Sequence, residues 1–277
     1  MVRLATRTWG EGASTDGRRP LAVLVHGVIS SSRTWWRVAP ALVGRGFEVL
    51  TVDLRGHGAS PPVREGLGLP DLAADLAETI QAHPAAALAG EAPAALRSPP
   101  VDLLVGHSLG ALVVSQLLAT RPWFARRLVL EDPPGIGTTD WAALADGIEA
   151  DGARARTDPA GLRGDLLAES PDSAPGEAER RVADLADCDT TAIAAALRLE
   201  VTYDLPGLMG SVEVPTLLLV GEEPLGSALL GPDRPALIGA LGQGTVEVLR
   251  AGHNLHREAF DAFMAALDRW LAGARLA

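Results

Sequence analysis

The chain has 277 residues, a formal net charge of −11, a hydrophobic fraction of 47% and a charged fraction of 21%. These fractions are ordinary for a globular protein, so a sizeable core can be buried and wholesale disorder is not expected. The negative charge repels phosphate backbones and anionic lipid surfaces, which argues against nucleic-acid or membrane partners. The length is typical of one α/β core with a modest insertion.

Cys188 is the only cysteine, so no intrachain disulfide can form and nothing indicates an oxidising compartment. Residues 1–12 lack the apolar segment of a secretory signal, and no apolar run approaches the roughly 18 residues of a membrane span. These features predict a cytoplasmic protein. We expect a monomer or a homodimer, between which the sequence does not distinguish.

Short apolar runs alternate with helical patterns along most of the chain. The runs predict an edge strand over 2–9 and further strands over 21–25, 47–52, 101–105, 128–130, 216–220 and 245–249. Between them, the patterns predict helices over 33–44, 70–82, 109–121, 233–241 and 257–271. Strands that alternate with helices predict a mainly parallel sheet covered on both faces.

Two stretches interrupt this alternation. Residues 83–100 are rich in Ala and Pro and predict a lengthened surface loop. Residues 135–209 contain helical patterns, including 141–150, 177–186 and 190–201, but no convincing strand. We therefore expect a core formed by 1–134 and 210–277, with 135–209 inserted as a helical cap over the strand ends where open α/β sheets bind ligands.

The segment Gly106-His107-Ser108-Leu109-Gly110 lies directly between an apolar strand pattern and an apolar helix pattern. A serine on so tight a turn has strained backbone geometry, and a glycine two residues to either side removes Cβ atoms that would collide. The motif and its context predict that Ser108 is a nucleophile.

A serine nucleophile needs a base and an oxyanion hole. His253 follows the last predicted strand after a short turn, whereas His256 lies closer to the final helix, so His253 is the better candidate base. One oxyanion donor is expected to be the N–H of Leu109. The other is expected to be the N–H of Val28, where glycine precedes it in the loop after the first core strand.

Four motifs together resemble the α/β-hydrolase fold family. They are His26-Gly27, Asp53-Leu54-Arg55-Gly56-His57-Gly58-Ala59-Ser60, Gly106-His107-Ser108-Leu109-Gly110 and Gly252-His253-Asn254. The order and spacing of all four match, and the resemblance covers nearly the whole chain. It implies an α/β-hydrolase fold with esterase-like chemistry, and it implies that Arg55 and His57 organise a loop.

The acid that would orient His253 departs from the commonest pattern of this family. That pattern places an Asp about three residues after Gly221, where this chain has Pro224. Glu223 could substitute if the loop shifts by one residue. A minority of family members, including some haloalkane dehalogenases, carry the acid one strand earlier, where this chain has Asp132. We favour Asp132, with Glu223 as the main alternative and Glu131 or Glu222 behind it.

Three tryptophans are candidates for the substrate pocket, namely Trp35 and Trp36 after the oxyanion loop and Trp141 at the start of the cap. The sequence contains no cluster with metal-ligand spacing, no dinucleotide signature and no phosphate loop, so no metal and no cofactor is expected. Apolar segments in the cap favour a moderately hydrophobic substrate.

These features predict a serine hydrolase that cleaves a small-molecule carboxylic ester or lactone through an acyl-enzyme. Other chemistries that use the same residues stay open, namely hydrolysis of carbon–carbon bonds, perhydrolase or haloperoxidase activity, and thioesterase or cyclase activity. A different class is also open, a ligand receptor that keeps the fold without the chemistry, since proline occupies the usual acid position.

Overall fold

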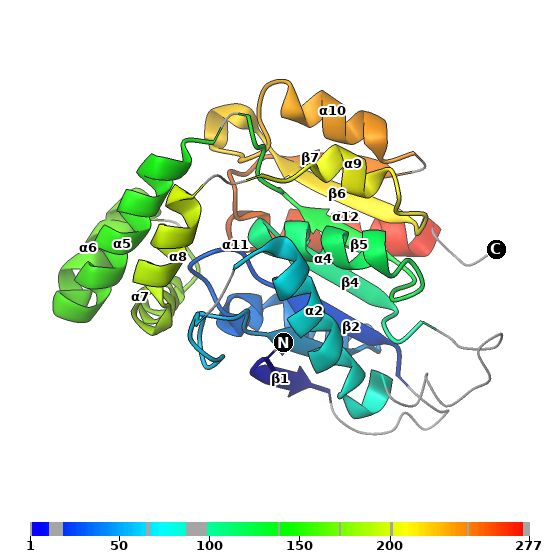
Figure 1. Cartoon of the computed structure of the whole chain (residues 1–277), viewed down its shortest axis with the longest axis horizontal. Helices are drawn as coiled ribbons and strands as arrows, with labels where there is room; N and C mark the ends of the chain where they lie inside the picture. Colours follow the sequence, from blue (N-terminus) through cyan, green and yellow to red (C-terminus); the bar gives the residue numbers. More distant parts are fainter. Residues whose placement is uncertain are drawn as a thin grey trace.

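The structure is a computed structural model that describes residues 2–10, 19–64, 67–86, 99–137, 139–171, 173–199, 202–242 and 244–273. Its centre is a seven-stranded sheet (Figure 1). The strands are β1 (Thr6–Trp9), β2 (Leu21–Val25), β3 (Glu48–Val52), β4 (Leu103–His107), β5 (Leu128–Glu131), β6 (Thr216–Gly221) and β7 (Thr245–Leu249). Most of the predicted loop over 83–100 lies outside the described residues.

The strands are arranged in the order β1-β3-β2-β4-β5-β6-β7. Only β1 pairs antiparallel, with β3, and all other neighbours are parallel. The prediction of a mainly parallel α/β sheet is therefore confirmed. Because β3 is added on one side of β2 and β4 on the other, the carboxyl ends of β2 and β4 flank the switch point, where open α/β sheets bind their ligands.

Helices cover both faces of this sheet. On one face lie α2 (Leu69–Gln81), α4 (Leu109–Thr120), α9 (Leu205–Met209) and α10 (Asp233–Ala240), and on the other lie α1 (Val38–Val43) and α12 (Phe260–Gly273). Among the described residues, no helix combines the length and apolarity needed to cross a bilayer.

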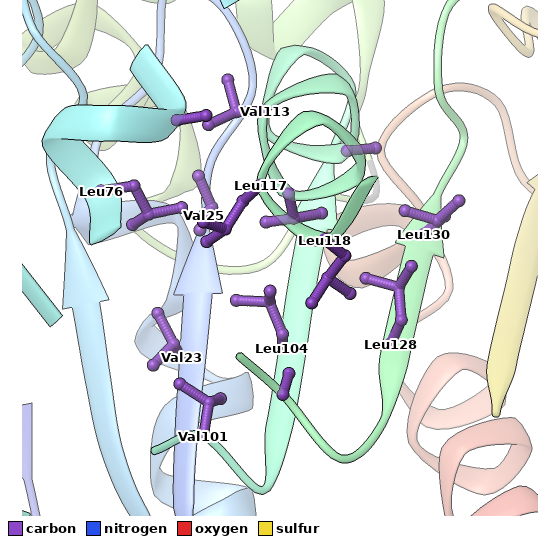
Figure 2. Packing of buried hydrophobic residues seen from close by; sticks show 14 of the residues in the cluster. Val23, Val25, Leu76, Val101, Leu104, Val113, Leu117, Leu118, Leu128 and Leu130 are labelled. Atoms are coloured by element: carbon purple, nitrogen blue, oxygen red, sulfur yellow. The ribbon is translucent and has the colours of Figure 1, made fainter. Parts of the chain in front are cut away.

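Apart from the edge strand β7, the parallel strands are buried on both faces, which explains their nearly continuous apolar sequences. Val23 and Val25 of β2 pack toward Leu76 and Leu117 on the α2 and α4 side (Figure 2). Leu24, with the opposite orientation, packs in the cluster on the other face. The period of two along each strand therefore divides its side chains between two cores.

Two predicted helices are each divided in the structure. The first consists of a 3-10 helix, η1 (Ser32–Trp36), and α1; the Ser31 hydroxyl caps η1 by accepting from Arg33 N. The last consists of α11 (Leu255–Glu258) and α12, separated at Ala259, whose backbone is not helical (φ −134°, ψ 49°). One division follows the loop after β2 and the other follows the loop after β7.

The inserted segment consists of α5 (Trp141–Thr157), α6 (Pro159–Glu169), α7 (Glu177–Asp187) and α8 (Thr190–Arg198), followed by α9. Helix α5 contacts α6, α7 and α8, and Figure 1 shows these four helices grouped to one side of the sheet. Aspartate side chains cap three of them, Asp140 for α5, Asp158 for α6 and Asp189 for α8. Helix α9 packs instead against α4 and α10.

The sequence analysis did not predict α6, and it gave α5 a shorter extent than the structure does. Their apolar residues do not form a strong stripe. Helix α6 buries Leu162 and Leu166 in a small cluster with residues of α7 and with Ala155 of α5, and α5 also buries Ile148 against Ile193 of α8. This tertiary packing stabilises helices that local patterning alone does not indicate.

We expect Gly110→Ala to destabilise the fold. A Cβ at Gly110 would lie 2.6 Å from the carbonyl oxygen of His26 and closer still to that of Val25, and backbone atoms cannot rotate away. The free energy of unfolding, measured in urea, should fall by about 1–3 kcal/mol. Gly147→Ala is the matched control, since nothing lies near a Cβ there and alanine in helix α5 should add roughly 0.5–1 kcal/mol. Equal stability of the two variants would contradict the close approach.

Candidate active site

Ser108 occupies the turn between β4 and α4 in a strained conformation, with φ 52° and ψ −119°. Its backbone N–H donates to the carbonyl of Glu131 at 3.0 Å, which fixes the turn to the end of the next strand. A Cβ at Gly106 would lie 2.5 Å from the carbonyl oxygen of Gly110, so the turn can close only with glycine there. A strained serine held this firmly is typical of a functional position.

The loop after β2 lies against this turn. A Cβ at Gly27 would approach Ser108 Cβ to 2.9 Å and His107 Nδ1 to 2.8 Å. Val28, the next residue, is half-buried and packs against the apolar cluster formed by Ile148 of α5, Cys188 and Ile193 of α8. The structure therefore brings the Val28 segment to the side of Ser108. Helix α4 begins there at Leu109, and the N–H of Leu109 has no acceptor within the helix.

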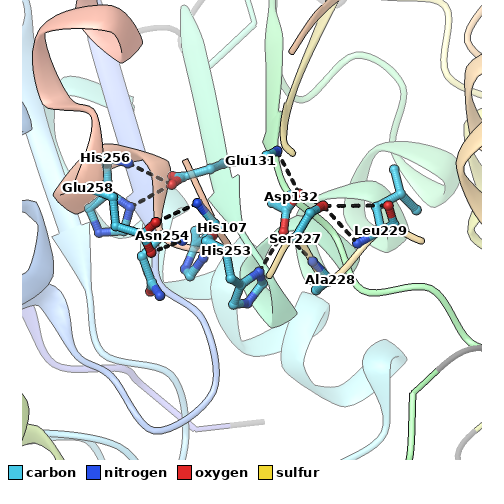
Figure 3. A network of polar contacts seen from close by, with 12 residues as sticks. His107, Glu131, Asp132, Ser227, Ala228, Leu229, His253, Asn254, His256 and Glu258 are labelled. Atoms are coloured by element: carbon cyan, nitrogen blue, oxygen red, sulfur yellow. Dashed lines mark hydrogen bonds and ion pairs between the residues drawn. The ribbon is translucent and has the colours of Figure 1, made fainter. Parts of the chain in front are cut away.

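Asp132 and His253 are brought together from the ends of β5 and β7. His253 Nδ1 lies 2.7 Å from Asp132 Oδ2, and the carboxylate is fully buried (Figure 3). The carboxylate also accepts hydrogen bonds from three further donors: Ser227 Oγ at 2.6 Å, Ala228 N at 2.6 Å and Gly221 N at 3.1 Å. Since Asp132 accepts from Nδ1–H, the other ring nitrogen, Nε2, is left to exchange a proton.

His107 connects His253 to the strained turn. Its Nε2 donates to the carbonyl oxygen of His253 at 3.0 Å, and the two ring centroids are 4.7 Å apart. His253 therefore packs against the residue that directly precedes Ser108. Its side chain keeps 28% of its surface exposed, in contrast to the closed environment of the acid.

The other candidate acids lie elsewhere. Glu223 is exposed and forms an ion pair with Arg234 at 3.6 Å, and Glu222 is half-buried next to it. Glu131 points away from His253 and instead contacts His256, with 2.7 Å between Oε1 and Nδ1. Adjacent residues at a strand end face opposite sides, which is why Glu131 and Asp132 contact different histidines.

The pair formed by Glu131 and His256 belongs to a buried network that the sequence analysis did not predict. Arg257 Nε donates to Thr34 Oγ1 at 2.8 Å, and Thr34 Oγ1 lies 2.5 Å from His256 Nε2. Because an arginine can only donate, Thr34 accepts from it and gives its own hydrogen to His256. His256 then carries its proton on Nδ1 and donates it to Glu131, which fixes the start of α11 directly after His253.

Burial favours the neutral forms of this cluster. It raises the pKa of Glu131 above its usual value and lowers the pKa of His107 and of His256 well below theirs. Ligand atoms of these three residues lie within 4.8 Å of one another, the one such group found in the described part of the chain. All three already form the hydrogen bonds given above, so the geometry is that of a structural network.

The predicted pocket tryptophans occupy three different environments. Trp35 is fully buried in the core with its ring 4.5 Å from that of His256, so the structure places it away from any surface that a ligand could reach. Trp36 donates from Nε1 to Glu177 of α7 at 3.0 Å. Trp141 is half-buried and packs edge-on against Tyr203 at 6.1 Å. The patterns that singled out these residues carry no information on which ring faces a cavity.

The segment from Asp53 to Ser60 supports the loop after β2. Asp53 accepts from the backbone of Ser32 at 2.6 Å, and His26 Nε2 accepts from Leu54 N at 2.9 Å. Arg55 forms a buried ion pair with Asp75 at 2.6 Å. The first two contacts join the loops at the carboxyl ends of β2 and β3, and the ion pair joins the loop after β3 to helix α2.

Comparison with known protein families identifies the family of this chain. The family model described as the alpha/beta hydrolase family matches residues 22–266. The chain therefore belongs to the alpha/beta hydrolase family, and the resemblance seen in the four sequence motifs is confirmed.

Individual relatives are hydrolases by name. The chain is similar to the sn-1-specific diacylglycerol lipase ABHD11 of Mus musculus, 34% identical over 137 residues that cover 49% of this chain and 39% of the relative. It is also similar to the pimeloyl-(acyl-carrier protein) methyl ester esterase of Aeromonas hydrophila, 32% identical over 139 residues that cover 48% of this chain and 46% of the relative. The chain thus matches less than half the length of these curated relatives.

Solved structures match over nearly the whole chain. A hydrolase from Pseudomonas aeruginosa PA01 has a TM-score of 0.71 and 25% identity, covering 97% of this chain and 94% of that one. The enol-lactonase from Burkholderia xenovorans LB400 has a TM-score of 0.71 and 20% identity, covering 97% and 96%. These likenesses establish the fold, and the names of the relatives support hydrolase activity.

We expect stability to decrease in mild acid because two buried histidines stay neutral in the folded chain. Burial lowers the pKa of His26 to about 4 and that of His57 to about 3. Unfolded histidines bind a proton near pH 6.5. The free energy of unfolding therefore has its full value above pH 6.5, where these histidines are neutral in both states. It decreases as the pH falls toward 4, because only the unfolded chain then binds the protons.

The free energy of unfolding in urea should be lower at pH 4.5 than at pH 7 by about 2 kcal/mol for each of these histidines. His57→Phe removes one titrating group; it also removes the hydrogen bond between Nδ1 and the carbonyl of Arg55, a loss that lowers stability at both pH values and so does not affect the comparison between them. The variant should show a weaker pH dependence than the wild type. An unchanged dependence would contradict a neutral, buried His57.

Proposed function

We propose that the protein is a serine hydrolase that cleaves a carboxylic ester or lactone of a small to medium-sized, moderately hydrophobic molecule. The observation that carries this proposal is the strained Ser108, at φ 52°, with His107 linking it to His253 and its partner Asp132. A serine in this position supports acyl transfer. It disfavours the chemistry of relatives that need an aspartate nucleophile to form an alkyl-enzyme ester.

In the proposed reaction, Ser108 Oγ attacks the substrate carbonyl carbon while His253 Nε2 accepts the serine proton. The fully buried Asp132 keeps the proton of His253 on Nδ1 and stabilises the imidazolium that forms. His253 then returns the proton to the departing alkoxide oxygen, which leaves an acyl group on Ser108. Water attacks this ester with His253 again acting as the base, and free acid and Ser108 are restored.

The negative charge that develops on the carbonyl oxygen needs two preorganised donors. The backbone N–H of Leu109 at the first position of α4 and that of Val28 after Gly27 are the proposed pair. The N-terminal end of α4 adds a favourable dipole at the same place. The contact between Gly27 and Ser108 supports this assignment, since it brings the loop to the side of the nucleophile.

The first test is the hydrolysis of p-nitrophenyl butyrate at neutral pH. Ser108→Ala should lower the turnover by about 10⁶-fold, because attack and proton transfer act as one unit. Ser173→Ala, in the cap segment, should not change it. Covalent labelling of Ser108 by a fluorophosphonate, followed by mass spectrometry, tests the nucleophile even if the cap excludes this ester. Neither turnover nor labelling in the wild type would favour the receptor alternative.

The acid is tested by comparing Asp132→Asn with Glu223→Gln. Asp132→Asn should lower kcat by roughly 10⁴-fold because the asparagine no longer fixes the productive tautomer of His253. Glu223→Gln should have near wild-type kcat, since Glu223 is exposed and contacts Arg234. Thermal unfolding of both variants controls for folding, since Asp132 accepts several buried hydrogen bonds. Normal turnover in Asp132→Asn with an inactive Glu223→Gln would reverse the assignment.

A further inference from the structure

The segment after β6 surrounds the carboxylate of Asp132 with hydrogen-bond donors. Gly221 N donates to Oδ1 at 3.1 Å, Ser227 Oγ donates to Oδ1 at 2.6 Å, and Ala228 N donates to Oδ2 at 2.6 Å (Figure 3). His253 Nδ1 is the fourth donor, and it also contacts Oδ2. The segment after β6 therefore holds the acid, although the acid itself comes from the end of the neighbouring strand, β5.

The contacts of Ser227 fix the direction of its hydroxyl hydrogen. A hydroxyl carries one hydrogen and two lone pairs. Ser227 Oγ accepts from Arg234 Nη2 at 3.0 Å and from Leu229 N at 3.3 Å, so both lone pairs are in use. Its hydrogen therefore points to Asp132 Oδ1 at 2.6 Å, since the carbonyl oxygen of Leu229 lies farther away, at 3.5 Å.

Arg234, in the first turn of α10, joins the two residues that donate to Asp132 Oδ1. Its Nη2 has two hydrogens, of which one is donated to the carbonyl oxygen of Gly221 at 2.7 Å and one to Ser227 Oγ at 3.0 Å. Its Nε donates to the carbonyl oxygen of Leu229 at 2.9 Å. The rigid guanidinium therefore contacts the segment after β6 at three points and fixes both donors to Oδ1.

Asp132 depends on its surroundings for its position. Its backbone φ is 41°, in the left-handed region that is uncommon for residues other than glycine, and such a conformation persists only where the surrounding structure holds it. The carboxylate is also fully buried, where an oxygen without a hydrogen bond is costly. The donors of the segment after β6 meet the second requirement, and by holding the side chain they also restrain the backbone.

The geometry points to Ser227 and Arg234 as positioning residues of the proposed reaction. Arg234 directs the hydroxyl of Ser227 and the peptide of Gly221 toward Asp132 Oδ1, which leaves Oδ2 facing His253 Nδ1. The terminal torsion of an aspartate is soft, so without these contacts the carboxylate rotates and no longer holds the proton of His253 on Nδ1. This inference rests on the proposed function, because the orientation of His253 affects the rate only if His253 is the base.

The test measures kcat and KM for p-nitrophenyl butyrate in variants of the two residues. Ser227→Ala should lower kcat by about 10- to 100-fold, which corresponds to one hydrogen bond to a charged group, and should leave KM unchanged. Arg234→Met, which keeps the length of the side chain without its donors, should have a similar effect. The double variant should lose less than the product of the two single losses, because Arg234 acts through Ser227. Arg234→Lys, which keeps donors but not the fork, should give an intermediate kcat.

Three control variants remove comparable contacts without removing a donor to the acid. Ser115→Ala removes a buried hydroxyl that donates to a backbone carbonyl of α4. Arg126→Met removes a half-buried arginine that pairs with Asp102, at the opposite end of the sheet. Glu223→Gln removes an ion pair of 3.6 Å but leaves the donors of Arg234 in place. All three should have wild-type kcat, and thermal unfolding shows whether each variant is folded.

Proton NMR in water tests the positioning without any hydrolysis. The Nδ1–H of His253, held by Asp132, should give a downfield signal that is assigned by its absence in His253→Gln. Ser227→Ala and Arg234→Met should broaden this signal, because a carboxylate that rotates exposes the proton to exchange with water, whereas the control variants should keep it sharp. Loss of the signal in both variants supports the inference even if no ester is hydrolysed, which separates it from a failure of the proposed function.

A sharp signal in both Ser227→Ala and Arg234→Met overturns the inference, whether or not kcat falls. A lost signal with wild-type kcat, in a protein that hydrolyses the ester, also overturns it, as does an equal loss of kcat in Ser115→Ala or Arg126→Met. If Arg234→Met does not fold, Ser227→Ala and Arg234→Lys differ less from the wild type and decide the question by the same two measurements.

Discussion

The hydrogen bond between Asp132 and His253 joins the ends of two strands that are not neighbours. Strand β6 lies between β5 and β7, so the contact has to pass over its end. It does so at Gly221, whose N–H donates to the Asp132 carboxylate and whose missing Cβ leaves room for the carbonyl of Gly252. The positions of both partners therefore depend on glycine at the end of β6.

The end of β5 carries a second contact, which points to the other side of the sheet. Glu131 and Asp132 are consecutive, and each contacts a different histidine of the segment after β7. The segment is thus fixed at two points, 253 and 256, on the two sides of β5. Two anchors at this spacing restrict both the position and the rotation of the His253 ring, which proton transfer requires to be precise to within a fraction of an ångström.

Much of this arrangement could be predicted from the sequence, and the reasons for success and failure are physical. Continuous apolar runs and the glycine-flanked Ser108 are local patterns, so the strands of the sheet and the strained turn could be predicted from the sequence. The preference for Asp132 over Glu223 could not be derived from spacing alone, because it depends on which strand end lies opposite His253. The burial of Trp35 in the core could not be predicted either, since a core tryptophan and a pocket tryptophan cannot be distinguished in a single sequence.

The inserted helices are positioned by charged contacts in addition to the apolar packing of Val28, Ile29 and Leu67 against them. The sheet is held by two apolar clusters, whereas α7 meets the Ser31 to Trp36 segment through carboxylates and arginines. Charge pairs in a partly buried interface fix the register of a helix, because a shift leaves ions unpaired. Arg257 takes part in both systems, since it orients Thr34 toward His256 and pairs with Glu177 of the cap. Helix α7 and the segment that carries His253 are therefore positioned by one shared guanidinium.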